Sequence, residues 1–304
     1  MKKTISLCVS VFLIMSTLMM PAFATSNEDT VYVNIAPIIF SRSVSQTAEE
    51  YEYYVDLGVY YYVNGRLVSE TERIYFEYAV LNVPNSANQV DAYKMLSEFS
   101  DRAIQGINGY QDNLYCEAVR RDDASALYNC HSYAWYSTST DNCYWIDNPT
   151  NFYLGNNDYH EVTTPTVGDI ICYFNGSYNI HSGIVTAVNG QVSNGKCGNS
   201  NTVEVISKWG TAGLYEHNGY ECPYTQYGGG AATSVKYFHK HTFIYSVNGA
   251  NESIHTVTCS ACNYSYVDNH TYRSLPSGGS RCTKCGYTSS GQIIMSETPK
   301  PVEQ

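Results

Sequence analysis

Apolar and polar residues alternate along the early part of the chain. The alternation extends over residues 31–83, and the dipeptide Asn64-Gly65 divides it into two runs rich in Tyr and Val. Alternation of this kind predicts strands with one buried face, and Asn-Gly between two such runs predicts a hairpin turn. We therefore expect a small antiparallel β element, of roughly three strands, in residues 25–84.

The period changes after Asn88. The next apolar positions recur every three or four residues: Val90, Tyr93, Leu96, Phe99 and Ala103. This spacing predicts one amphipathic helix that ends near Gly106. A second helix is predicted over residues 130–136, with Asn129 as its N-cap.

Runs typical of strands return after Pro165. They cover residues 169–174, 180–188 and 202–208, and Asn-Gly dipeptides at 175–176, 189–190 and 194–195 mark turns. Helices followed by an antiparallel sheet predict the α+β fold class.

The first 24 residues have the pattern of an export signal. Lys2 and Lys3 precede an apolar run at residues 5–20, and residues 21–24 (Pro-Ala-Phe-Ala) form a cleavage site of the A-x-A type. The run is shorter than the ~20 residues that a membrane span requires. We expect residues 1–24 to be a signal peptide, with an uncleaved N-terminal anchor as the alternative. The protein should then be secreted, extracellular or associated with the cell wall, with no transmembrane segment after cleavage.

Acidic residues outnumber basic residues. The chain has 28 Asp and Glu against 17 Lys and Arg, which gives a net charge of −11. Binding to nucleic acid requires a basic surface that replaces the counterions of the phosphates. The charge therefore argues against a nucleic-acid partner.

Cys130 is the first candidate for chemistry, because it opens the second predicted helix. The positive end of the helix dipole and the free backbone N–H groups there lower the pKa of a thiol toward the nucleophilic thiolate. Such a thiol needs an imidazole as its base, and His181, which opens the predicted strand at 180–188, is the candidate. The alternatives are a structural or disulfide-bonded Cys130 and a strand-end His181 bonded to backbone.

Three motifs around these residues resemble the CHAP family, the cysteine- and histidine-dependent amidohydrolases/peptidases, and their papain-like relatives among bacterial cell-wall hydrolases. The motifs read N-C-H-S-Y-A-W from Asn129, P-T-V-G-D-I-I-C-Y-F from Pro165 and I-H-S-G-I-V from Ile180. The resemblance implies a papain-like core in residues 85–246, with N-terminal helices packed on an antiparallel sheet. It also implies that Cys130 is the nucleophile and that His181 is the general base, which later protonates the leaving amine. The substrate would be an amide or peptide bond of peptidoglycan, and no cofactor would take part in catalysis.

The third catalytic position departs from the family pattern. The family places an acidic or amide side chain on the next strand, where this chain has Lys208, and a charged Lys has no lone pair for an imidazole N–H. Strand alternation places Glu204 on the same face as Lys208, so we take Glu204 as the orienting group. Ser207 is the alternative if a bulge turns it inward.

Two further histidines lie near these motifs. His131 follows the nucleophile, but a helical neighbour projects about 100° away, so we expect it on the surface or in a cap. His217 receives no role.

The C-terminal part carries two C-x-x-C pairs. Cys259 and Cys262 are followed after 19 residues by Cys282 and Cys285, a spacing that fits a zinc ribbon. We expect residues 247–288 to form a zinc-ribbon-like module with one structural zinc on these four thiolates, with His255 or His270 as a substitute or second-site ligand. Two disulfides are the alternative for an exported chain. Residues 289–304 are polar and predict a disordered tail.

These features together predict a secreted thiol hydrolase that cleaves amide or peptide bonds, with peptidoglycan as its substrate. A secreted cysteine protease acting on proteins would use the same Cys–His pair. A surface-binding protein without catalytic activity is the rival from a different class, and Lys208 in place of the expected amide favours it.

Overall fold

The protein is described from a computed structural model. The structure describes residues 31–33, 53–63, 66–84, 86–155, 158–192, 194–248, 253–262, 264–276 and 278–288. The predicted signal peptide and the predicted C-terminal tail lie outside these residues.

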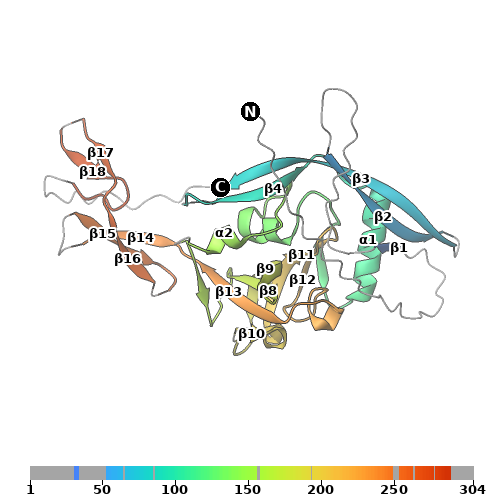
Figure 1. The fold of residues 1–304 in the computed structure, drawn as a ribbon. Helices are drawn as coiled ribbons and strands as arrows, with labels where there is room; N and C mark the ends of the chain where they lie inside the picture. The colour runs from blue at the N-terminus through green and yellow to red at the C-terminus, as the bar shows by residue number, and fades with distance from the viewer. Residues whose placement is uncertain are drawn as a thin grey trace, which may run out of the picture.

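An N-terminal antiparallel sheet has the strand order β1-β2-β3-β4-β6. Its strands are β1 (Val31–Val33), β2 (Tyr53–Val63), β3 (Arg66–Asn82), β4 (Gln89–Met95) and β6 (Tyr144–Trp145). In β2 and β3, Val63 lies opposite Arg66, as in the predicted hairpin, although Asn64 and Gly65 themselves lie outside the described residues. Figure 1 shows β2, β3 and β4 as long strands that arch over the rest of the protein.

The helix predicted between Asn88 and Gly106 was wrong for its first half. Residues Gln89–Met95 form β4, in which Val90 and Ala92 are buried while Gln89 and Asp91 are exposed. This strand pairs with β3 at seven residues, which satisfies its backbone hydrogen bonds. Strand pairing therefore determines its conformation, although its apolar residues recur every three to four positions as in a helix. The helix α1 (Asp101–Leu114) begins only after Ser100, whose side chain accepts a hydrogen bond from the Ala103 N–H.

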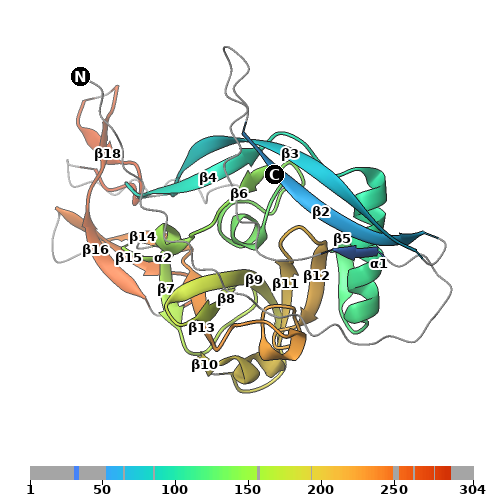
Figure 2. The same cartoon turned by 45° about the vertical axis from the view of Figure 1, so that its right-hand side comes forward.

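A second, larger sheet lies at the centre of the protein (Figure 2). Its strand order is β10-β13-β8-β9-β11-β12-β5, and β7 pairs with β13. Its strands are β5 (Val119–Asp122), β7 (Tyr159–Val162), β8 (Ile170–Asn175), β9 (Tyr178–Val188), β10 (Gly195–Lys196), β11 (Val203–Lys208), β12 (Leu214–Asn218) and β13 (Ser234–Lys240). The three strands predicted after Pro165 are therefore confirmed as β8, β9 and β11.

Short helical turns lie around this central sheet. They are η1 (Ser132–Tyr136, a π-helix), α2 (Thr150–Tyr153), η2 (Cys197–Thr202) and η3 (Gln226–Gly228). None of them has more than six residues.

The α+β fold class with a papain-like core was wrong. Among the described residues the chain is mostly β-sheet, and α1 is the one helix longer than seven residues. Antiparallel sheets, rather than helices packed on one sheet, form the framework. The prediction failed because, over a short run of residues, the apolar pattern of a strand can also be read as the three- to four-residue spacing of a helix.

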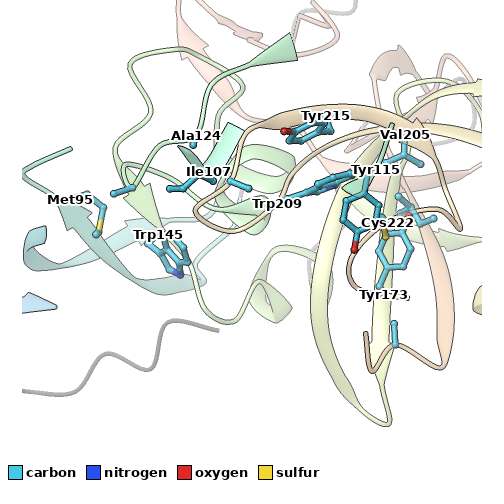
Figure 3. Packing of buried hydrophobic residues seen from close by; sticks show 14 of the residues in the cluster. Met95, Ile107, Tyr115, Ala124, Trp145, Tyr173, Val205, Trp209, Tyr215 and Cys222 are labelled. Atoms are coloured by element: carbon cyan, nitrogen blue, oxygen red, sulfur yellow. The ribbon is translucent and has the colours of Figure 1, made fainter. Parts of the chain in front are cut away.

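The core of the central region is aromatic. Trp209 stacks on Tyr215, with ring centroids 4.1 Å apart, and meets Tyr115 edge-on at 4.9 Å. Figure 3 shows these rings beside Tyr173 and Cys222. The core reaches α1 through the buried Ile107.

The C-terminal module projects from one side of the central sheet and follows directly after β13 (Figure 1). It contains a three-stranded sheet of β14 (Phe243–Val247), β15 (Ile254–Cys259) and β16 (Ser265–Asn269), and a pair of β17 (Tyr272–Ser274) and β18 (Ser280–Cys282). No helix among the described residues is long and apolar enough to span a membrane.

Candidate functional site

Cys130 opens a short helix, as the sequence predicts. The helical residues are 130–136, and the Asn129 Oδ1 accepts a hydrogen bond from the Ser132 N–H at 3.0 Å. The same oxygen accepts the Ile146 N–H at 3.2 Å, and Asn129 Nδ2 donates to the Ile146 carbonyl at 2.7 Å. The Asn129 side chain therefore fixes the turn that presents Cys130.

The thiol of Cys130 is buried beside the start of β9. Backbone N–H groups of Ser182 and His131 face the sulfur and favour the thiolate, but the loss of solvation is larger and raises the pKa of Cys130 to about 11. The expectation that the helix end lowers this pKa was wrong for this state of the protein, because burial outweighs the N–H groups. The resting thiol is neutral.

His181 is fully buried and its orientation is fixed on two sides. Its Nε2 lies 3.0 Å from the Ser207 hydroxyl on the neighbouring strand β11. The ring of Tyr224 stacks on the imidazole, with centroids 3.8 Å apart and planes 7° apart. Burial lowers the pKa of His181 well below its ordinary value, so the imidazole is neutral.

A chain of hydrogen bonds determines which nitrogen of His181 carries the proton. His217 Nδ1 lies 2.7 Å from the Asn218 carbonyl, which can only accept, so His217 Nδ1 carries the proton. Burial lowers the pKa of His217 to about 4, so its Nε2 is an acceptor, and the Ser207 hydroxyl donates to it at 2.8 Å. Ser207 Oγ must then accept from His181, as it also does from the Trp209 Nε1–H at 3.1 Å.

His181 therefore carries its proton on Nε2 and has an unprotonated Nδ1. This Nδ1 is buried and has no hydrogen-bond partner among the described residues. An imidazole nitrogen with a free lone pair is what a general base requires. The Cys130 sulfur makes no hydrogen bond to this nitrogen, although the N–H of the next residue, Ser182, faces the sulfur. Sequence reasoning kept Ser207 as the alternative orienting group, on the condition of a bulge, and gave His217 no role. The pairing of β11 with β12, which brings His217 to Ser207, is not visible in the sequence.

The orienting contact belongs to Ser207 rather than to Glu204. Glu204 is half-buried and accepts a hydrogen bond from Asn189 at 3.2 Å. Ser207 lies on the opposite face of β11 from Glu204, as the strand alternation predicts, and the register with β12 is unbroken from Glu204 to Lys208. The register shift against β9 skips a residue of β9, so this bulge does not change which way the residues of β11 face. The prediction took the orienting group from the face of Lys208, whereas the hydrogen bond to His181 comes from the opposite face, at Ser207.

Lys208 is buried with all its donors used. Its Nζ donates to the carbonyls of Ser125 at 2.9 Å and Gly210 at 2.8 Å, and also to that of Ala212. Burial lowers the pKa of Lys208 to about 7. The side chain connects the segment before Cys130 to the turn after β11, so it has a structural role at the position where the family resemblance expects an amide.

His131 lies in the interior, so the expectation of a surface or capping role was wrong. Its Nδ1 lies 2.9 Å from the Ser182 hydroxyl, which also accepts from the Trp135 Nε1–H at 3.0 Å. Cys172 lies on the other side of this hydroxyl, with its sulfur at 3.6 Å. Because residues 131 and 182 directly follow Cys130 and His181, this contact holds together the two segments that carry the candidate residues.

The four cysteines of the C-terminal module do not form one group. The structure divides them into two clusters, each with two cysteines and two histidines, whose ligand atoms all lie within 4.8 Å of one another. The first cluster is His239, His241, Cys259 and Cys262, and the second is His255, His270, Cys282 and Cys285. Either cluster could hold a metal ion. The prediction of a single four-thiolate site was therefore wrong in its ligand set.

Distances inside the clusters suit a small tetrahedral ion. His239 Nε2 lies 3.7 Å from the Cys259 sulfur, and His241 Nδ1 lies 3.6 Å from the Cys262 sulfur. The second cluster contains Nδ1-to-sulfur distances of 3.7 Å, for His255 and Cys282, and 3.3 Å, for His270 and Cys285. Bonds of about 2.0 Å to nitrogen and 2.3 Å to sulfur place tetrahedral ligands roughly 3.3–3.8 Å apart.

Sequence reasoning found the four cysteines and named His255 and His270 as possible ligands, but it missed His239 and His241. The signal was available in the repeat of His-Thr-aromatic units at His241 and His270. Each unit is followed by one C-x-x-C pair and by a Tyr that stacks on the histidine: Tyr264 on His241 and Tyr287 on His270. Comparison of the chain with protein-family models, with curated proteins and with solved structures gives no match.

Proposed function

We propose that the protein is a secreted thiol hydrolase of amide or peptide bonds, with Cys130 as nucleophile and His181 as general base. The observation that carries the proposal is Nδ1 of His181, which is unprotonated and has no hydrogen-bond partner among the described residues. His181 directly precedes Ser182, whose backbone N–H faces the Cys130 sulfur. Peptidoglycan is the proposed substrate class, on the motifs around Cys130 and His181, and secretion is proposed on the signal pattern of residues 1–24.

The proposed reaction begins from a neutral thiol and a neutral imidazole. Nδ1 of His181 takes the thiol proton as the sulfur attacks the carbonyl carbon, and the N–H groups near the sulfur stabilise the developing oxyanion. The imidazolium keeps its Nε2–H on Ser207 and gives the Nδ1 proton to the leaving amine. Water then attacks the thioester, with His181 again as base, and releases the carboxylic acid and the free thiol.

One observation favours the rival function, a surface-binding protein without catalysis. Cys130 and His181 are both buried, and the Tyr224 ring covers the imidazole. Hydrolysis therefore requires the segment that carries Tyr224 to move when substrate binds. A binding protein would keep the same buried network for stability alone.

The test is mass spectrometry of fragments released from purified peptidoglycan by the chain without residues 1–24. Cys130→Ala is the matched variant, since it removes only the sulfur from a residue whose backbone cap is made by Asn129. We expect new fragments from the parent protein alone, and their masses identify the bond. Absence of release from walls of several chemotypes, with a folded protein, would leave the binding function as the better account.

For the C-terminal module we propose structural zinc. Two thiolates and two imidazoles form a set that zinc prefers, and each cluster supplies all four ligands of a tetrahedral ion. A site with four protein ligands has no open position for substrate, so the proposed role is folding rather than catalysis. Zinc content by inductively coupled plasma mass spectrometry tests this proposal, and paired disulfides without metal would contradict it.

A further inference from the structure

We propose that the two metal clusters have different roles, and that the first fastens the C-terminal module to the central sheet. The inference rests on the proposed zinc binding and assigns a separate role to each of the two clusters. His239 is a residue of β13, which pairs with β8 in the central sheet, whereas Cys259 ends β15 of the module. An ion in the first cluster therefore bonds both parts of the protein.

The ligand His239 is tied into the central sheet by a buried carboxylate. Its Nδ1 lies 2.6 Å from Asp169 Oδ1, so the Nδ1–H points to Asp169 and the Nε2 points to the metal position. This is the carboxylate–histidine–metal arrangement that orients ligands in zinc sites. The second oxygen of Asp169 accepts the Thr166 N–H at 2.7 Å, so the carboxylate is held on both sides.

Asp169 connects this site to the strands of the candidate catalytic pair. It directly precedes β8, and its carbonyl accepts the Val185 N–H of β9 at 2.8 Å. His181 lies on the same strand, opposite Tyr173 of β8. The first metal position is thus joined to β8 and β9 through one side chain and one backbone hydrogen bond.

The second cluster is internal to the module. His255 lies on β15, Cys282 ends β18, and all four ligands come from residues after the central sheet. The two clusters share only the strand β15, where His255 and Cys259 are four residues apart, a distance of about 13 Å along an extended strand. Loss of an ion here should disturb the module and leave the central sheet unchanged.

The experiment uses the full mature chain with zinc and needs no hydrolysis. Zinc content should be two ions for the parent protein, one for Cys262→Ser and one for Cys285→Ser. Cys116→Ser is the matched control, because Cys116 is exposed and belongs to neither cluster. Two ions should remain in this control.

Urea unfolding followed by tryptophan emission then separates the two roles. The three tryptophans of the chain, Trp135, Trp145 and Trp209, all lie before the module, so the emission reports on the central region. We expect Cys262→Ser to lower the unfolding midpoint and Cys285→Ser to leave it at the value of Cys116→Ser. Asp169→Asn should lower the zinc affinity of the first site by about 10- to 100-fold in competition with a chelator, with the second site unchanged.

Equal urea unfolding midpoints for Cys262→Ser and Cys285→Ser, with two zinc ions in the parent protein, would overturn the separate roles of the two clusters. The proposed zinc binding itself would then stand. A parent protein with one ion or none would overturn both. Neither result depends on whether Cys130 is catalytic.

Discussion

The central region and the C-terminal module are stabilised in different ways. The central region buries large apolar clusters around Trp209 and Trp135, and its buried polar groups form connected hydrogen bonds. In the described part of the module, Val257 and Tyr287 are the buried apolar side chains besides two cysteines. A segment with so little apolar burial cannot offset its conformational entropy without a further constraint, which metal ions in the two clusters would provide.

The same contrast distinguishes the cysteines of the two regions. In the central region burial raises the pKa of Cys130 to about 11 and that of Cys172 to about 12, so these thiols are neutral. In the module each cysteine lies within 4 Å of a histidine nitrogen, in a cluster that favours a metal-bound thiolate. The surroundings, rather than the residue type, determine whether a thiol is a metal ligand or a candidate nucleophile.

Chelation should have the largest effect and should separate the two regions. Structural zinc contributes roughly 10–16 kcal/mol to folding in small zinc domains, so removal of zinc should unfold the module. Limited proteolysis in the presence of a strong chelator should then cut within residues 247–288 and leave the central region intact. A module that resists the protease without zinc would show that the contrast between the two regions is wrong.

Ser207→Ala should have the next largest effect, on catalysis. The substitution removes the acceptor for the His181 Nε2–H, and we expect kcat to fall by about 10²- to 10³-fold with little change in KM. The pH dependence of kcat should also change, because His181 can then carry its proton on either nitrogen. A purely structural role for Ser207 would not move that profile.

Glu204→Gln is the matched control for Ser207→Ala. Glu204 lies on the same strand but bonds to Asn189, so kcat should stay at the parent value. Loss of activity in Glu204→Gln, with an active Ser207→Ala, would return the orienting role to the carboxylate.

Lys208→Met tests whether Lys208 is structural. The variant leaves the carbonyls of Ser125, Gly210 and Ala212 without their donor, and we expect a loss of about 2–4 kcal/mol in the free energy of unfolding. The pKa of Lys208 is about 7 in the folded protein and has an ordinary value of 10.5, so the unfolded chain binds more protons between these values. The parent protein should therefore gain stability relative to Lys208→Met as the pH rises from 7 to 10.5. A difference that stays constant or shrinks over this range, in urea titrations, would contradict the lowered pKa.

Alkylation of Cys130 gives the smallest and most local test. With its pKa raised to about 11, the thiolate fraction grows about tenfold per pH unit, so the rate with iodoacetamide should climb steadily from pH 7 to 10. Peptide mapping should show Cys130 reacting more slowly than the exposed Cys116 at every pH in this range. A rate that reaches a plateau below pH 8.5 would instead indicate a thiolate–imidazolium pair at rest.

Local signals in the sequence predicted local features well. Asn-Gly at 175–176 predicted the turn between β8 and β9, where Gly176 has a φ of 61°, and Asn129 predicted the cap in front of Cys130. These features depend on few neighbouring residues. The burial of Cys130 was not predictable in the same way, because it depends on chain segments far away in sequence, such as the one that carries Tyr224.

Pairing between distant strands also limited the prediction of the site. The contacts of Ser207 with His181 and His217 depend on the pairing of β11 with β9 and with β12, and a single sequence contains neither pairing. The division of the cysteines into two clusters required the fold of β15, which presents one ligand to each cluster. Spacing alone indicated metal ligands but not their partners.

The most direct test of the account is the protonation state of His181, observed by ¹⁵N NMR of the imidazole nitrogens, with His181→Gln to assign the signals. The account predicts a neutral ring with its proton on Nε2 and a bare Nδ1, persisting well below the ordinary pKa of histidine because burial lowers the pKa of His181. In Ser207→Ala the ring should no longer hold one tautomer. A proton on Nδ1 of the parent protein, or a charged ring at neutral pH, would contradict the claim that this histidine is prepared to act as the base for Cys130.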